Sequence, residues 1–207
     1  MNSQSLRILK MVIVLSLASN LYAGPTVFDF KDPKGVNSML ISLDSVLEPI
    51  MGTANGITGT VSFDPENTKS LNGKIVVSAK TIQTTNKRMT KVLHSEDWID
   101  VNKYPSVEFN FNEILSIEKK GDTVYQLDVR GDFTLKGLTK KIEIPVQLSY
   151  LPGKLSSRQD KVNGDLLIIR TNFSIQRKEF NIKPEMDGTI VGETIKINVG
   201  IVGTAPR

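Results

Sequence analysis

The sequence of 207 residues contains no cysteine and only one histidine, His94. The absence of cysteine excludes disulfides, thiolate metal sites, haem attachment, a cysteine nucleophile and a lipid anchor on cysteine. One histidine is too few for a histidine-rich centre, so we predict no metal site. Aromatic residues are only 6% of the chain and are not interleaved with basic runs. Binding to nucleic acid is therefore not expected.

Long hydrophobic runs are also missing. The uncharged stretch from Met11 to Ala23 is 13 residues long, whereas a membrane-spanning helix needs about 20. It follows Arg7 and Lys10 and ends in a small residue, which is typical of a secretory signal peptide. We predict that residues 1–23 are a signal peptide cleaved after Ala23, with an uncleaved anchor as the alternative. The protein is then periplasmic or secreted, without stable membrane insertion.

The rest of the chain, residues 24–207, is predicted to form one domain, because no linker rich in Pro, Gly or Ser divides it. Without the two basic residues of the leader, the formal net charge falls from +4 to +2. Such a balance is weak evidence for a polyanionic partner.

Alternation of apolar and polar residues dominates this domain and predicts half-buried strands. The clearest runs are 125–135 and 142–150, joined by a short loop at 136–140 that suits an antiparallel hairpin. Further strands are predicted near 26–31, 39–43, 57–63, 75–79, 107–111, 165–175 and 195–201. Leu166 to Ile169 are all apolar, so that stretch is expected to be covered on both faces.

One stretch, 84–100, breaks the alternation. Met89, Val92 and Leu93 lie at helical spacing, and Asn86 is a plausible N-cap. We predict a short helix followed by an irregular connection through Trp98. This segment acts either as a lid over one end of the sheet or as a plug inside it.

Antiparallel strands with one apolar face must bury those faces against each other, in a closed barrel or a two-sheet sandwich. The pattern alone does not choose between them. A barrel of about eight strands has an interior wide enough for one ligand. Periodicity by itself favours a solid core, as in most proteins.

No convincing catalytic group is present. His94, Ser95 and Asp97 are too close along the chain to converge as a triad. Asp128 and Asp132 alternate with apolar residues and belong to a solvated strand face. We therefore predict no catalytic residue and no enzymatic activity.

The inward apolar face is the most informative feature. An elongated guest buried there gains about 0.8 kcal/mol per methylene, so a chain of roughly 20 to 40 carbons binds tightly with few polar contacts. The predicted ligand-binding residues on the strands are Val107, Phe109, Phe111, Leu127, Val129, Phe133, Ile144, Val146, Leu148, Phe173, Ile197 and Val199. Those on the helical segment are Met89, Leu93 and Trp98.

Two motifs carry a resemblance to a known family. The segment from Arg88 through Trp98 to Phe109 resembles the signature R-x-x-x-L-x-S-x-D-F-F-D-x-x-x-Y-P-x-I-x-F of YceI-like proteins. Residues 131–140, Gly-Asp-Phe-Thr-Leu-Lys-Gly-Leu-Thr-Lys, resemble the G-D-L-T-L-x-G-V-T-K hairpin of the same family. The resemblance implies a lipocalin-like, all-β, eight-stranded antiparallel barrel that holds a polyisoprenoid, of quinone or prenyl phosphate type, in an elongated cavity.

The chain also departs from that pattern. Many YceI-like proteins have an Asp-x-x-His-Ser segment, but here the matching region ends in Asn37-Ser38. We expect a non-catalytic carrier of an apolar ligand, with no cofactor other than a bound lipid. A homodimer is a possible assembly of this carrier. The alternatives are a structural or stress-related envelope protein with a filled barrel, and a protein that sequesters hydrophobic toxins or antibiotics.

Overall fold

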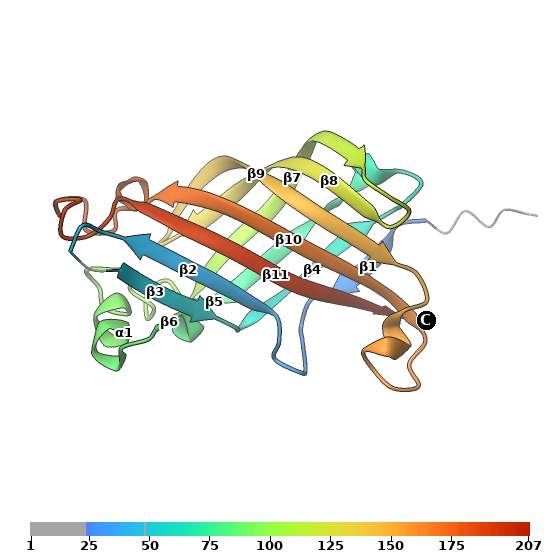
Figure 1. The fold of residues 1–207 in the computed structure, drawn as a ribbon, viewed down its shortest axis with the longest axis horizontal. Coiled ribbons are helices and arrows are strands. Elements are labelled where there is room, and N and C mark those ends of the chain that lie inside the picture. Colours follow the sequence, from blue (N-terminus) through green and yellow to red (C-terminus); the bar gives the residue numbers. More distant parts are fainter. Residues whose placement is uncertain (1–23, 48) are drawn as a thin grey trace, which may run out of the picture.

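A computed structural model describes residues 24–47 and 49–207 (Figure 1). The predicted signal peptide lies outside the described residues. Among the residues that are described, no helix is both long and apolar enough to cross a membrane.

Strands make up most of the structure. In chain order they are β1 (Thr26–Asp29), β2 (Ser38–Asp44), β3 (Pro49–Ala54), β4 (Ile57–Phe63), β5 (Asn72–Ser78), β6 (Gln83–Thr84), β7 (Ser106–Lys119), β8 (Val124–Leu135), β9 (Leu138–Leu151), β10 (Gly164–Gln176) and β11 (Thr194–Pro206). The helix α1 spans Lys87–Leu93, and 3-10 turns lie at η1 (Thr68–Ser70), η2 (Ala79–Thr81), η3 (Leu155–Ser157) and η4 (Arg177–Phe180).

The strands close into a barrel. Neighbours pair antiparallel in the order β1-β4-β5-β7-β8-β9-β10-β11, and the pairing of Asp29 with Thr204 joins β11 back to β1. The eight-stranded antiparallel barrel with one short helix is therefore confirmed for the described part of the chain. At one end, β2, β3 and β6 continue the sheet from β11, with Ile197 opposite Ile41 and Ile41 opposite Gly52.

Two strands and one loop length differ from the sequence prediction. β3 and β6 were not expected, because β3 begins at Pro49 and contains Gly52 instead of an alternating pattern. The hairpin between β8 and β9 turns on only Lys136 and Gly137, both with positive φ. Gly137 has a second constraint, since a Cβ there would lie 2.4 Å from the Tyr104 ring.

The C-terminus lies at one end of the barrel (Figure 1), which we call the closed end, and this end is packed with fully buried side chains. Phe63 packs edge-on against Tyr125, with 5.6 Å between ring centroids. Leu148, which is opposite Tyr125 in the sheet, is fully buried. The predicted two-sided burial at the start of β10 is confirmed, because Leu166 and Leu167 are both buried and η3 contacts this strand.

A buried carboxylate helps to hold the closed end together. Asp165 accepts hydrogen bonds from the Gly153 amide at 2.7 Å and the Tyr150 hydroxyl at 3.0 Å, and it pairs with Arg207 at 2.5 Å. Burial alone would raise the pKa of Asp165, but these three donors outweigh it and lower the pKa below its usual value.

This shift predicts a loss of stability in acid. Because the folded-state pKa is depressed, the contribution of Asp165 is fully present above its unfolded pKa of about 3.9 and disappears as the pH falls through the folded value. We expect Asp165→Asn to lower the free energy of unfolding at neutral pH and to flatten its decline below about pH 4. Urea unfolding across this pH range measures both effects. Asp128→Asn, at an exposed position, is the control, and an equal flattening in both variants would contradict the assignment.

Candidate apolar binding chamber

A cavity of about 530 Å³ opens at the end of the barrel opposite the closed end. We call it the mouth chamber. It lies among α1, the turn between β2 and β3, and the segment between η4 and β11, which Figure 1 shows gathered at one end of the molecule. Its volume is within the range of small-molecule sites. The apolar walls include Met39, Ile41, Leu43, Ile50, Ile82, Ile99, Leu135, Ile175, Ile182, Val191 and Ile195.

Helix α1 forms one wall of the mouth chamber. Asn86 is the N-cap, and its side chain accepts hydrogen bonds from the amides of Arg88 at 2.8 Å and Met89 at 3.3 Å. Met89 and Leu93, one turn apart, both line the chamber. None of the residues of α1 is buried, so the helix covers the chamber as a lid and does not plug the barrel.

His94, at the C-cap of α1, has a structural place. Its Nε2 lies 2.7 Å from the carbonyl oxygen of Ile82, which joins the end of the helix to the residue before β6. The side chain is half-buried and is not part of the chamber wall. Within the described residues, no group of three or more His, Asp or Glu side chains is arranged to hold a metal ion.

A much smaller void of about 60 Å³ lies deeper in the barrel. Met39, Val107 and Phe133 line both this inner void and the mouth chamber. The Phe133 ring is fixed by edge-on contacts with Phe173 and Phe180, at centroid distances of 5.9 and 5.5 Å. The expected elongated cavity is therefore divided, with Phe133 at the division.

The predicted ligand-binding residues lie in three places: the mouth chamber, the inner void and the packed interior that borders neither cavity. Lining the mouth chamber are Val107, Phe133, Ile197, Met89, Leu93 and Trp98. Lining the inner void are, besides Val107 and Phe133, the side chains of Phe109, Phe111, Ile144, Val146, Phe173 and Val199. Leu127, Val129 and Leu148 line neither cavity and pack in the solid interior. Contact of any of these residues with a ligand stays a prediction.

Several chamber residues were not predicted, and those from the segment 181–193 are the most important. Ile182, Ile190 and Val191 line the mouth, but this segment has neither strand nor helix periodicity. We call residues 181–193 the rim loop. An apolar residue in an irregular segment gives no periodic signal of the side it faces, so sequence patterns could not place these side chains.

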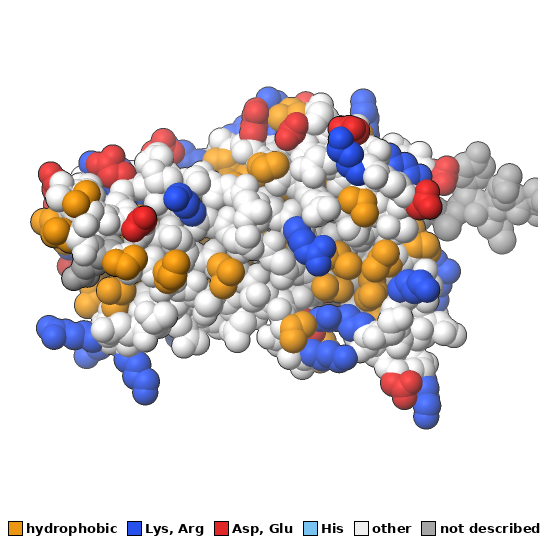
Figure 2. Space-filling view, in the orientation of Figure 1, with side chains coloured by type: hydrophobic (Ala, Val, Ile, Leu, Met, Phe, Trp, Pro, Cys, Tyr) orange, Lys and Arg blue, Asp and Glu red, His pale blue; other side chains and the backbone are white. Residues whose placement is uncertain are grey.

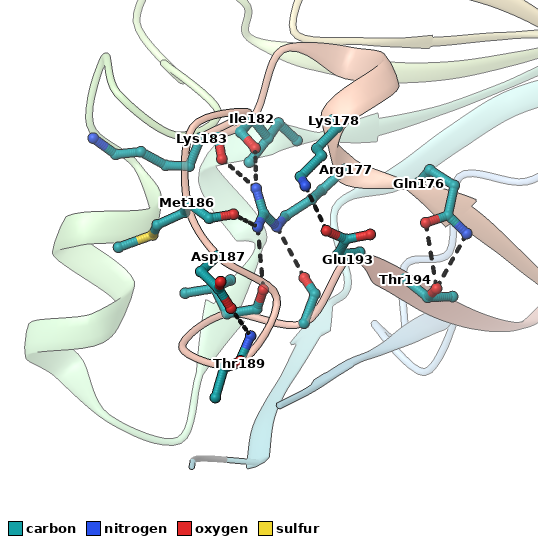
Figure 3. A network of polar contacts seen from close by, with 12 residues as sticks. Gln176, Arg177, Lys178, Ile182, Lys183, Met186, Asp187, Thr189, Glu193 and Thr194 are labelled. Atoms are coloured by element: carbon teal, nitrogen blue, oxygen red, sulfur yellow. Dashed lines mark hydrogen bonds and ion pairs between the residues drawn. The ribbon is translucent and has the colours of Figure 1, made fainter. Parts of the chain in front are cut away.

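A buried arginine holds the rim loop in place (Figure 3). Arg177, at the start of η4, is completely buried, and all of its five N–H groups donate to backbone carbonyls. The acceptors are the carbonyl oxygens of Gly192 (2.9 Å), Ile182 (3.0 Å), Lys183, Met186 (2.7 Å) and Val191 (3.1 Å). No carboxylate forms an ion pair with Arg177 in the described part of the chain. Carbonyl dipoles therefore supply all of the hydrogen bonds to its charge.

The polar side chains of the chamber wall come from one short segment. Thr84, Asn86 and Arg88 line the chamber where β6 leads into α1. Thr84 donates to the Asn86 carbonyl at 2.8 Å, which fixes the turn. Arg88 is the charged residue among the described lining residues, so the polar end of an amphiphilic ligand would be best accommodated here.

Asn37 occupies the position at which the family resemblance places a histidine. It is buried away from the chamber, in the connection between β1 and β2. Its Nδ2 donates to the carbonyls of Phe30 at 3.0 Å and Val202 at 3.1 Å, and its Oδ1 accepts from the Val202 amide at 2.8 Å. Asn37 therefore ties this connection to β11 instead of contacting a ligand.

We expect Asn37→Ala to lower the free energy of unfolding by about 2–4 kcal/mol, because it leaves three buried or partly buried backbone groups without their Asn37 partner. Chemical denaturation measures the effect. The exposed Asn112→Ala is the control and should change stability by less than about 0.5 kcal/mol. Ligand content per folded molecule should be unchanged in both, and loss of ligand from folded Asn37→Ala protein would place Asn37 at the site after all.

Comparison with known sequences identifies a family and relatives for this chain. The family model of the YceI-like domain matches residues 36–202. Protein YceI of Shigella flexneri is 28% identical over 137 residues, which is 66% of this chain and 65% of the relative. Protein YceI of Escherichia coli O157:H7 matches over the same lengths with the same identity. The match thus leaves about a third of each relative uncovered.

Solved structures show the same fold at lower identity. BcnA of Burkholderia cenocepacia superimposes with a TM-score of 0.64 at 20% identity, over 80% of this chain and 95% of that one. A polyisoprenoid binding domain from Saccharophagus degradans, implicated in plant cell wall breakdown, gives a TM-score of 0.59 at 8% identity, over 88% and 99% of the two chains.

Proposed function

Because the chain belongs to the YceI-like family, we propose that it is a non-catalytic carrier that holds a long apolar molecule with its tail in the mouth chamber. The observation that carries this proposal is the chamber itself, about 530 Å³ of space with mainly aliphatic walls. A filled barrel, the structural alternative, would lack such a space. The polyisoprenoid binding domain of Saccharophagus degradans, which shares the fold, makes a prenyl chain the first candidate ligand.

Burial of hydrocarbon supplies the affinity. Each methylene removed from water contributes about 0.8 kcal/mol, so a tail needs no polar contact with the protein to bind. Phe133 limits the depth, since it stands between the mouth chamber and the inner void. A tail too long for the chamber would reach the inner void only if the Phe133 ring moved out of its contacts with Phe173 and Phe180.

The polar end of the ligand lies beside Arg88 and Asn86. A guanidinium binds phosphate and also donates to a quinone oxygen, so both head-group types suggested by the family resemblance fit here. No carboxylate or imidazole belongs to the described chamber wall. Because general acid–base catalysis needs such groups within hydrogen-bond reach of the ligand, the walls favour holding a molecule unchanged.

The predicted signal peptide supports a periplasmic or secreted location, where an apolar molecule needs a carrier to cross water. Sequestration of hydrophobic toxins or antibiotics would use the same chamber and differ only in the ligand. The bound molecule distinguishes the two.

The test is extraction of the purified, folded protein with organic solvent, followed by mass spectrometry. We expect one lipid with a long apolar chain in near-stoichiometric amount. A lipid-free protein whose melting temperature does not change when polyprenol, quinone or apolar antibiotic is added would overturn the proposal, because any ligand of the folded state must raise stability.

A further inference from the structure

Exposed apolar side chains gather around the mouth of the chamber. Val46 and Leu47, in the turn between β2 and β3, are 81% and 65% exposed. Ile190 of the rim loop is 52% exposed, and Val92 of α1 is 45% exposed. Leu47, Ile190 and Val92 also line the mouth chamber. Three segments far apart in sequence thus present apolar tips at one place, and such clusters mark interaction surfaces.

The same end carries basic charge without partners. Lys87, Arg88 and Lys91 are all exposed on α1, the helix has no acidic residue, and no ion pair involves these three in the described residues. Figure 2 shows lysine and arginine side chains projecting from the molecule where α1 lies in Figure 1.

Two lysines near the rim loop differ, because each forms an ion pair with a carboxylate. Lys178 pairs with Glu193, and Lys183 pairs with Asp97 at 3.1 Å and Glu185 at 3.7 Å. The exposed basic side chains of α1, which form no ion pair in the described residues, thus lie directly beside the apolar tips.

We propose that the mouth end docks onto the surface of a bilayer that contains anionic lipids. Val46, Leu47, Val92 and Ile190 enter the boundary between head groups and acyl chains, and Lys87, Arg88 and Lys91 contact the anionic head groups. Apolar tips with flanking basic residues are the combination that binds such interfaces. This proposal goes beyond the carrier function. It rests on that function only because the ligand passes through the same opening of the mouth chamber.

A second copy of the chain is a poorer occupant of this surface. Two molecules meeting mouth to mouth would bring their basic α1 helices together, and like charges across an interface oppose association. An anionic bilayer instead offers opposite charge over the whole surface. Docking there also aligns the chamber opening with the acyl layer, so that an apolar ligand leaves the bilayer without crossing water.

The first experiment measures binding of the purified protein to vesicles by flotation. We expect binding to phosphatidylcholine vesicles that contain phosphatidylglycerol, weaker binding to phosphatidylcholine alone, and weakening by salt. Each lysine near an anionic surface strengthens binding about fivefold, so Lys87→Gln with Lys91→Gln should weaken it roughly 25-fold. Both variants spare Arg88, which lines the chamber.

The matched control removes two charges at the closed end. Lys154 and Lys161 are exposed beside η3, and Lys154→Gln with Lys161→Gln should leave vesicle binding unchanged. Equal loss of vesicle binding in the two double variants would show that net charge alone explains the effect, and this would overturn the proposal. Absence of binding by the unaltered protein would overturn it as well.

The second experiment uses the lack of cysteine in the chain. A polarity-sensitive fluorophore on Val46→Cys should shift to the blue when anionic vesicles are added, whereas one on Ser156→Cys in η3 should not. A shift at residue 46 that follows protein concentration instead of vesicles would identify a second copy as the occupant and overturn the proposal. If the protein binds vesicles but no lipid can be extracted from it, the carrier function fails while the docking proposal stands.

Discussion

Replacing Arg177 by methionine is expected to lower the free energy of unfolding by about 3–5 kcal/mol, as for loss of one partner of a buried charged contact. Methionine fills similar space but cannot donate, so five backbone carbonyls of the rim loop lose their partner. A loss of this size is a large fraction of the stability of an ordinary domain. Urea denaturation measures it, and hydrogen exchange should show faster exchange of residues 181–193 than of β8.

Two further variants separate the geometry of Arg177 from its charge. Arg177→Lys keeps the charge but has three donors instead of a planar fork of five, so we expect most of the loss to remain. Lys178→Ala, next in sequence, removes only an exposed ion pair with Glu193 and should cost less than about 1 kcal/mol. Full stability of Arg177→Lys would show that charge alone holds the rim loop.

Met89→Glu is expected to abolish loading of the chamber while leaving the protein folded. Met89 is half-buried on α1 and lines the chamber. In the empty chamber the introduced carboxylate can reach water, but an apolar ligand would bury it without a partner, at a cost of several kcal/mol. At 1.4 kcal/mol per factor of ten, affinity falls by more than about 100-fold. Extraction and mass spectrometry, with circular dichroism for folding, measure the outcome.

The matched control places the same carboxylate on the outside of the barrel. Gln147 is exposed on β9, so Gln147→Glu should neither unfold the protein nor change its ligand content. Loading of Met89→Glu should recover in part as the pH falls, because burial raises the pKa of a carboxylic acid and protonation removes its charge. Undiminished loading of Met89→Glu at neutral pH would show that the ligand does not occupy the mouth chamber.

For the strands that the alternation predicted, the side to which a residue points could be predicted from sequence. Val129 is fully buried and its neighbour Asp128 is exposed, because successive side chains of a strand face opposite sides of the sheet. The Asn86 N-cap was also predictable from local sequence, because helix capping depends on residues within one helical turn.

Depth along the barrel axis could not be predicted in this way. Leu148 and Val199 both face inward, but Leu148 pairs with Tyr125 towards the closed end and Val199 lines the inner void. Their levels depend on the register between strands, which is set by the whole closed sheet. Arg177 was missed because its acceptors lie 5 to 15 residues further along the chain, and nothing within the local sequence distinguishes it from an exposed arginine.

The position of the chamber at one end of a barrel whose other end is solid has a practical consequence. Residues that set the size of the chamber, such as Leu93 and Ile195, are only partly buried, whereas the aromatic cluster around Phe63 supports the fold from a distance. Because substitutions at distant sites without shared partners have nearly additive effects, changes to the chamber wall should leave the stabilising contribution of the Phe63 cluster intact. Chamber size and barrel stability can therefore be varied separately.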